Sequence, residues 1–272
     1  MGLLKEIFSY GFMTRAFIVG GLVALCASLL GVILVLKRYS MIGDGLSHVG
    51  FGALSIAMVM NVAPLSIAVP VVVAAAFFLL RISENGKMKG DAAIGIISSS
   101  AIALGVTITA LSSGMNADVY SYMFGSVLSM GREDVILSVI LSIVVLTIFC
   151  LFYDKIFAIT FDEAFAKATG TKVDFYNMLL AFLTAITIVV GMRIMGTMLI
   201  SGLIIFPALS SMRIFRSFKS VMLSAAIISV CCFFIGIIIS YAWAIPTGAS
   251  IVLSNLGIFL IFVLLGKILG RD

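Results

Sequence analysis

The sequence predicts an all-α polytopic membrane protein that crosses a bilayer with about eight or nine helices. Of its 272 residues, 62% are hydrophobic and 11% are charged, and the mean hydropathy is +1.29; these values lie far from those of soluble domains. Uncharged runs such as FIVGGLVALCASLLGVILVL recur along the chain, and each is close to the roughly 20 residues that a helix needs to cross the hydrocarbon core. A membrane β-barrel is excluded because its strands alternate between apolar and polar residues.

Nine apolar segments are the expected helices, and they form one transmembrane domain that covers residues 1–272. The sixth and seventh segments are short, and the sequence GMRIMG between them either turns a hairpin or interrupts one long, broken helix. The loops are too short to hold a soluble domain. The expected helices span residues 16–36, 43–62, 64–81, 92–112, 134–153, 175–191, 194–212, 221–242 and 249–268.

The distribution of basic residues predicts the orientation of the chain. If the first span runs from the outside to the inside and the spans alternate, most lysines and arginines fall on one face, which the positive-inside rule assigns to the cytoplasm. The N-terminus is then external, the C-terminus cytoplasmic and the number of spans odd, which favours the hairpin over the broken helix. The cytoplasmic face holds Lys37, Arg38, Arg81, Lys87, Lys89, Lys155, Lys167, Lys172, Arg213, Arg216, Lys219, Lys267 and Arg271, and the external face holds Lys5, Arg15, Arg132 and Arg193.

The net charge of +5 does not indicate a nucleic-acid partner, because the basic residues lie in short loops where they orient the spans. The four cysteines all lie in apolar runs without metal-ligand spacing, so we expect them to pack as small apolar side chains. The first apolar run is too long for the core of a signal peptide and is expected to remain as a span. The chain has no GxxxxGK[ST] phosphate loop and so lacks this means of binding ATP.

Two cytoplasmic segments have the spacing of short amphipathic helices at the membrane edge. Residues 153–174 place Phe161, Phe165 and Ala168 on one side and charged residues on the other. The apolar side of such a helix is covered either by lipid headgroups or by a groove on a cytoplasmic subunit, in which basic residues ring aromatic anchors. The second segment, residues 210–220, combines Met212, Phe215 and Phe218 with Arg213, Arg216 and Lys219.

The segment MIGDGLSHVG places Asp44 and the only histidine of the chain, His48, between apolar runs. An ionised aspartate in a span costs roughly 2.5 to 3.5 kcal/mol, so such residues usually face a bundle interior or a water-filled cavity and mark an ion path. The i, i+4 spacing puts both side chains on one helix face, and a carboxylate with an imidazole suits divalent first-row metals. Two ligands bind a passing ion loosely, as a conduit requires, and a second copy of the chain could double the set. Two alternatives remain open, with Asp44 as the N-cap of the second span and His48 as a hydrogen-bonded interior histidine.

Several segments resemble, in the same order, the ABC-3 family of metal permeases, the membrane subunits of binding-protein-dependent ABC importers. The resemblance extends from about residue 15 to residue 265. Its segments are LKRYSMIGDGLSHVGFGAL, DAAIGIISSSAIALGV (91–106), ADVYSYMFGSVLSM (117–130), FDEAFAKATG (161–170) and GMRIMGTMLISGLIIFPALSSM (191–212).

The resemblance implies a single vitamin B12 importer-like (type II) permease domain that acts as a homodimer in a bacterial-type cytoplasmic membrane. ATP-binding cassette subunits would dock on the cytoplasmic side and hydrolyse ATP, and an extracytoplasmic metal-binding protein would deliver the metal. The chain itself would be no enzyme and would keep no permanently bound cofactor. The resemblance places Asp44 and His48 on the translocation path as metal ligands. It assigns contact with the ATPase to Met212, Arg213, Phe215 and Arg216.

The transported ion implied by the resemblance is a divalent transition metal, with zinc favoured and manganese or iron as the other choices. The sequence departs from many zinc-type relatives in its single histidine and in Gly45, where threonine or alanine is common. Two other functions are weaker. A stand-alone proton-coupled metal transporter would need more carboxylates within its spans than Asp44, and a membrane-embedded metalloenzyme would need about three protein ligands.

Overall fold

The computed structural model describes residues 11–85, 90–112 and 132–270. Every regular element in these ranges is a helix, as predicted, and all nine expected segments are present. The largest difference in a boundary is at the first helix, which begins at Gly11 rather than at residue 16. In chain order the helices are α2 (Gly11–Leu36), α3 (Ile42–Val59), α4 (Pro64–Asn85), α5 (Gly90–Leu111), α7 (Arg132–Leu151), α8 (Tyr153–Phe161), α9 (Glu163–Ala168), α10 (Val173–Met195), α11 (Thr197–Ile214), α12 (Phe218–Trp243) and α13 (Thr247–Ile268).

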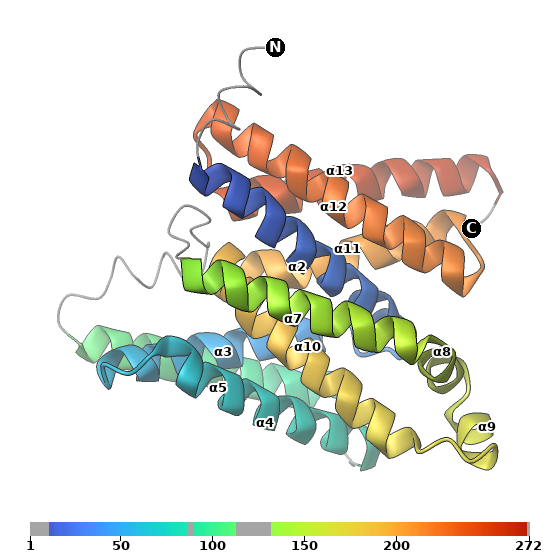
Figure 1. Ribbon diagram of the computed structural model, residues 1–272, viewed down its shortest axis with the longest axis horizontal. Coiled ribbons are helices and arrows are strands. Elements are labelled where there is room, and N and C mark those ends of the chain that lie inside the picture. Colours follow the sequence, from blue (N-terminus) through green and yellow to red (C-terminus); the bar gives the residue numbers. More distant parts are fainter. Residues whose placement is uncertain (1–10, 86–89, 113–131, 271–272) are drawn as a thin grey trace.

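The long helices lie side by side in two packed groups (Figure 1). In one group α3 packs against α4 and α5, and in the other α2, α11, α12 and α13 pack against one another. Helix α10 contacts α2 and α4 and thereby connects the groups, while α7 packs against α2. Helix α3 also contacts α11, so the helix that carries Asp44 and His48 lies where the two groups meet.

Seven of the described helices are long and apolar enough to cross a membrane, namely α2, α3, α4, α5, α10, α12 and α13. Helix α7 passes the same test only together with α8, from which it is bent by 73°. Helix α11 has a shorter apolar stretch, Leu199–Ile214. These eight candidate spans and α11 correspond to the nine predicted segments, and the fold class of an all-α polytopic membrane protein is confirmed.

A hairpin joins α10 and α11, so the alternative of a single broken helix is wrong. The turn is made at Gly196, whose φ of 90° and ψ of 160° belong to a region that residues other than glycine rarely adopt. Beyond this residue the chain doubles back, because a Cβ built on Gly191 of α10 would overlap the side chain of Ile200 of α11. A continuous helix would hold these two residues about 13 Å apart along its axis.

We expect Gly196→Ala to destabilise the protein by about 1 to 3 kcal/mol, because alanine must either adopt the strained backbone conformation or distort the hairpin. The measurement is the thermal unfolding midpoint of the protein purified in detergent. Gly257→Ala is the matched control, since a Cβ on Gly257 in α13 meets no atom within 4 Å. Equal midpoints for the two variants would contradict the prediction.

The segment 153–174 forms two short helices rather than one. Helix α8 ends at Phe161, and the side chain of Asp162 caps α9 by accepting a hydrogen bond from the backbone N–H of Phe165 at 2.8 Å. Helix α9 ends before Gly170, which has a φ of 82°. The apolar side chains that the sequence placed on one side are uncovered, since Phe161 and Phe165 are 57% and 63% exposed and Ala168 is exposed as well.

The segment 210–220 is not a separate amphipathic helix, so this prediction is wrong. Its first part continues α11 as far as Ile214, and its last part is the beginning of α12 at Phe218. The reason is local: Phe215 has extended backbone angles, and Ser217 then caps α12 by accepting a hydrogen bond from the N–H of Ser220 at 3.2 Å. The segment is therefore a tight turn between two long helices.

An aromatic cluster joins these two segments into one surface. The ring of Phe218, buried at the start of α12, contacts the rings of Tyr153, Phe157 and Phe161 of α8. The centroid distances are 5.6, 5.3 and 5.7 Å, respectively. The rings meet at tilted or edge-on angles, and aromatic pairs of this kind are worth about 0.5 to 1.5 kcal/mol each beyond the burial of their area, so α8 is held against the α11–α12 turn.

The basic side chains gather at one end of the bundle. In Figure 1, helices α8 and α9, the α11–α12 turn and the end of α13 lie at the same end. Because the long helices alternate in direction, the last turn of α2 and the first turn of α10 belong to this end too. The described basic residues in these parts of the chain are Lys37, Arg38, Lys155, Lys167, Lys172, Arg213, Arg216, Lys219 and Lys267.

Candidate metal-translocation site

A tight turn between α2 and α3 places Asp44 at the start of α3. Helix α2 ends in a Schellman motif, in which the N–H of Tyr39 donates to the carbonyl of Leu34 at 2.7 Å. Arg38 takes the left-handed φ of 63° that this motif requires. The carbonyl of Tyr39 then accepts a hydrogen bond from the N–H of Ile42 at 3.0 Å, where α3 begins.

Asp44 lies in the first turn of α3, so the alternative that it is the N-cap is wrong. The N-cap is Met41, which makes no side-chain capping hydrogen bond. A carboxylate in the first turn is favoured by the free backbone N–H groups and the helix dipole, which offsets part of the cost of placing a charge among apolar helices. The hydroxyl of Ser47 donates to the backbone carbonyl of Asp44 at 2.7 Å and not to its carboxylate.

Close packing on two sides determines which way Asp44 and His48 face. A Cβ on Gly43 would overlap Ile204 of α11, and a Cβ on Gly45 would overlap Ile94 of α5. Successive residues of a helix are rotated by 100°, so Asp44 and His48 lie on the face between the side that meets α11 and the side that meets α5. Gly43 and Gly45 therefore let the neighbouring helices approach closely on both sides and leave this face open.

The two side chains lie close enough to hold one ion together. The Nε2 atom of His48 is 3.6 Å from Oδ2 of Asp44, and the side chains are 19% and 36% exposed, respectively. This distance is longer than a hydrogen bond, so the imidazole and the carboxylate are not hydrogen-bonded to each other. An ion placed about 2.1 Å from both atoms, the usual ligand distance of zinc, would make an angle of about 118° between them. The separation of the two atoms is therefore compatible with joint coordination of one ion.

A third polar group approaches the pair from α11. The hydroxyl of Ser201 hydrogen-bonds the carboxylate of Asp44, and Ser201 is three residues before Ile204, which packs on Gly43. The described residues contain no group of three or more His, Cys, Asp or Glu side chains that could hold a metal. The site therefore offers two strong ligands and one hydroxyl from one chain, which suits transient binding better than a closed structural metal site.

The candidate ATPase-docking residues lie away from this pair, at the basic end of the bundle. Met212 is half-buried and Arg213 is exposed in the last turn of α11, while Phe215 and Arg216 are exposed in the turn that follows. The aromatic cluster around Phe218 connects this turn with α8. The structure thus brings both segments that the sequence proposed for a partner into one surface.

Two features of the site were not predicted. Ser201 is one small polar residue in the apolar stretch LISGLIIF, and a serine at that place in a span is the only signal that the sequence carries. Lys37, which the sequence analysis treated only as a loop charge, is a buried partner of Glu163 and Asn177. Neither contact follows from sequence spacing, because each joins segments more than 100 residues apart.

A bundle of apolar helices that can cross a membrane, with short helices and basic turns at one end, defines a polytopic membrane protein. Residues 9–266 match the model of the ABC 3 transport family. The chain belongs to this family. The segment 117–130, which also contributed to the resemblance, lies outside the described residues.

Individual proteins agree with this assignment. The chain is 28% identical over 258 residues to the manganese import system permease protein ScaB of Streptococcus gordonii, covering 95% of this chain and 92% of the relative. It superposes on PsaBC from Streptococcus pneumoniae, solved in complex with Fab, with a TM-score of 0.86, 28% identity and coverage of 96% and 94%. A transporter assigned to the metal-chelate ABC type, in an inward-facing conformation, matches with a TM-score of 0.77 at 16% identity, covering 97% and 89%. The fold is therefore that of the metal-chelate (type II) ABC permeases.

Proposed function

We propose that the chain is the membrane permease subunit of an ABC importer that moves a divalent transition metal into the cytoplasm. The observation that carries the proposal is the Asp44–His48 pair, two metal-type ligands on one partly exposed helix face within a membrane protein of the ABC 3 transport family. A stand-alone proton-coupled transporter has no comparable support, because membership of this family argues for an importer with separate subunits.

We further propose manganese as the transported metal. Zinc was favoured from the sequence, but relatives such as ScaB and the manganese transport system membrane proteins MntC are named for manganese. The ligands fit this choice, because a carboxylate, a hydroxyl and a single imidazole form an oxygen-rich set, and oxygen ligands suit manganese. Zinc sites more often use several nitrogen or sulfur ligands.

In the proposed cycle, each ligand has a distinct task. The charged carboxylate of Asp44 attracts the dication from the external side, and the His48 imidazole replaces part of its water shell. Because one chain supplies so few ligands, binding is weak enough for the ion to leave. In a homodimer the two Asp44–His48 pairs would face a common path. The ion would then meet ligands from both copies of the chain, whether they bind it together or one after the other.

The energy would come from ATP-binding cassette subunits docked on the surface formed by α8, α9 and the α11–α12 turn. Exposed aromatic side chains beside arginines and lysines are what a protein interface uses as anchors and rim. This surface would then be cytoplasmic, which agrees with the excess of positive charge at that end. In this orientation the N-terminus would be outside and the C-terminus inside. An extracytoplasmic metal-binding protein would deliver the ion at the opposite end, and the membrane would be a bacterial-type cytoplasmic membrane.

The test is uptake of radiolabelled manganese and zinc by liposomes that contain the chain together with its ATPase subunit and binding protein. We expect ATP-dependent accumulation of manganese that exceeds that of zinc. Accumulation of zinc alone would correct the metal, and uptake driven by a proton gradient without ATP would support the stand-alone transporter. No ATP-dependent uptake of either metal would overturn the proposed function.

A further inference from the structure

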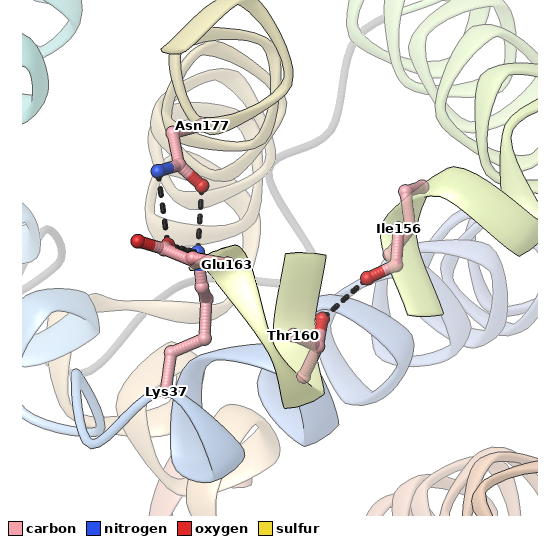
Figure 2. Close-up of polar contacts among 5 residues, drawn as sticks. All are labelled: Lys37, Ile156, Thr160, Glu163 and Asn177. Carbon is pink, nitrogen blue, oxygen red and sulfur yellow. Dashed lines mark hydrogen bonds and ion pairs between the residues drawn. The ribbon is translucent and has the colours of Figure 1, made fainter. Parts of the chain in front are cut away.

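A buried lysine joins three segments of the chain that are distant in sequence. Lys37 follows the end of α2, and its side chain is only 9% exposed. Its Nζ atom donates to Oε1 of Glu163 in α9 at 2.5 Å and to Oδ1 of Asn177 in α10 at 2.6 Å. The Nδ2 atom of Asn177 donates to the same Glu163 oxygen at 3.1 Å, so the three groups close a triangle (Figure 2).

Lys37 needs the hydrogen bonds to Glu163 and Asn177 because its side chain is largely removed from water. An ammonium group removed from water is costly unless a counter-charge and further hydrogen bonds replace its hydration, and Lys37 has both. Burial raises the pKa of Glu163, but the hydrogen bonds from Lys37 and Asn177 and the Lys37 charge outweigh it, so the pKa lies below its usual value. Glu163 therefore stays ionised at neutral pH, and the pair is lost only when acid protonates it below its usual pKa.

One side of this triangle leads directly to the candidate metal site. Lys37 is the residue before Arg38, which holds the strained left-handed position of the Schellman turn. Four residues after Arg38 the helix of Asp44 begins. The turn is fixed by backbone hydrogen bonds at both ends, so a displacement of Lys37 is passed on to the first turn of α3 rather than absorbed by a loose loop.

The other side leads to the proposed ATPase-docking surface. Glu163 is the first residue of α9, a helix of six residues in which Phe165 projects outward. A helix this short has little stability of its own in water. Its position therefore depends on contacts such as the one between Glu163 and Lys37.

We propose that Lys37, Glu163 and Asn177 form a coupling clamp that fixes α9 of the docking surface to the turn preceding the Asp44 helix. Lys37 is thus a positioning residue for transport, and the inference rests on the proposed function. When ATP binding or hydrolysis moves the docked subunit, the clamp transmits the displacement of α9 to α3 and changes access to the metal pair.

A cavity next to the clamp gives the turn room to move. It has a volume of about 30 Å³ and is lined by Lys37 and Asn177 of the clamp, by Ile42 and Leu46 of α3, and by Thr184 of α10. The buried hydroxyl of Thr184 has no hydrogen-bond partner in the described part of the chain. Well-packed interiors resist displacement, and this cavity leaves unfilled space beside the start of α3.

The test compares Lys37→Met with Lys267→Met, which removes the same charge from an exposed position on α13, outside the proposed docking surface. Lys37→Met keeps the length of the side chain and leaves no buried charge unpaired, because Glu163 is 48% exposed; the variant should therefore fold. The first measurement is hydrogen exchange of the backbone amides of residues 163–171 in the purified permease. We expect faster exchange in Lys37→Met than in the wild type or Lys267→Met, and unchanged exchange would overturn the clamp without any reference to transport.

The second measurement is the number of metal ions imported per ATP hydrolysed in proteoliposomes. We expect Lys37→Met to retain the bound ATPase and its hydrolysis rate but to lose about tenfold in this ratio, a typical size for coupling between two sites. Lys37→Arg, which keeps the charge, should restore most of the ratio. A ratio in Lys37→Met equal to that of Lys267→Met would overturn the coupling role, whereas failure of the wild type to import any metal would instead refute the proposed function.

Discussion

Asp44→Asn is expected to lower ATP-dependent metal uptake by roughly a hundredfold or more while leaving the protein in the membrane. Loss of outer-shell partners alone costs 10 to 100-fold at metal sites, and Asp44 supplies the only carboxylate of the pair. The substitution keeps the shape of the side chain and removes the charge from a span, so it does not lower stability through burial. His48→Ala should reduce uptake to a similar extent, because it leaves a single ligand.

The measurement is the initial rate of radiolabelled manganese uptake in reconstituted vesicles, normalised to the amount of permease. Asp174→Asn is the matched control, since Asp174 is exposed in the first turn of α10 and lies far along the chain from the pair. Its uptake should equal that of the wild type. Normal uptake by Asp44→Asn or by His48→Ala would remove the residue concerned from the proposed site.

The double variant Phe215→Ser/Arg216→Glu is expected to lose at least about tenfold of its affinity for the ATPase subunit, and with it ATP-dependent uptake. Both side chains are exposed in the α11–α12 turn, so the permease itself should remain folded. An aromatic anchor and a neighbouring arginine are typical residues whose loss costs 1 to 2 kcal/mol or more at an interface, and a glutamate adds repulsion if the partner surface is acidic.

Co-purification of the ATPase with the permease in detergent measures this effect. Trp243→Ser is the control, because Trp243 is 72% exposed at the end of α12 opposite to Phe218. Undiminished recovery of the ATPase with the Phe215→Ser/Arg216→Glu variant would move the docking surface elsewhere. If recovery fell only in variants of Phe161 or Phe165, the surface would be confined to α8 and α9.

The helices were predictable because every span needs about 20 predominantly apolar residues to cross the hydrocarbon core. A run of high hydropathy therefore identifies each span without knowledge of how the helices pack. The hairpin at Gly196 could be favoured from charge, but the choice was settled by backbone angles that only the folded chain has. The sequence predicted an amphipathic helix at 210–220 from its alternation of aromatic and basic residues. That pattern does not reveal that Phe215 is extended and that Ser217 starts a new helix.

The site was predictable only in part for a similar reason. Asp44 and His48 are four residues apart on one helix, so their proximity follows from helix geometry. The Ser201 contact and the Lys37–Glu163–Asn177 clamp depend on how α9, α10 and α11 pack against α2 and α3, and no periodicity in one sequence encodes that packing. Whether the pair acts as the metal site remains the central prediction to be tested.

The position of Phe218 has a consequence for the biogenesis of the transporter. The ring that holds α8 in place belongs to α12. During synthesis from the N-terminus, α8 therefore cannot reach its final packing until α12 has been made. A permease that is still on the ribosome, or that is truncated before α12, would lack the contacts between Phe218 and α8. We expect such a chain not to bind the ATPase subunit. The fold thereby makes synthesis of α12 a condition for completing the surface that we propose for ATPase docking.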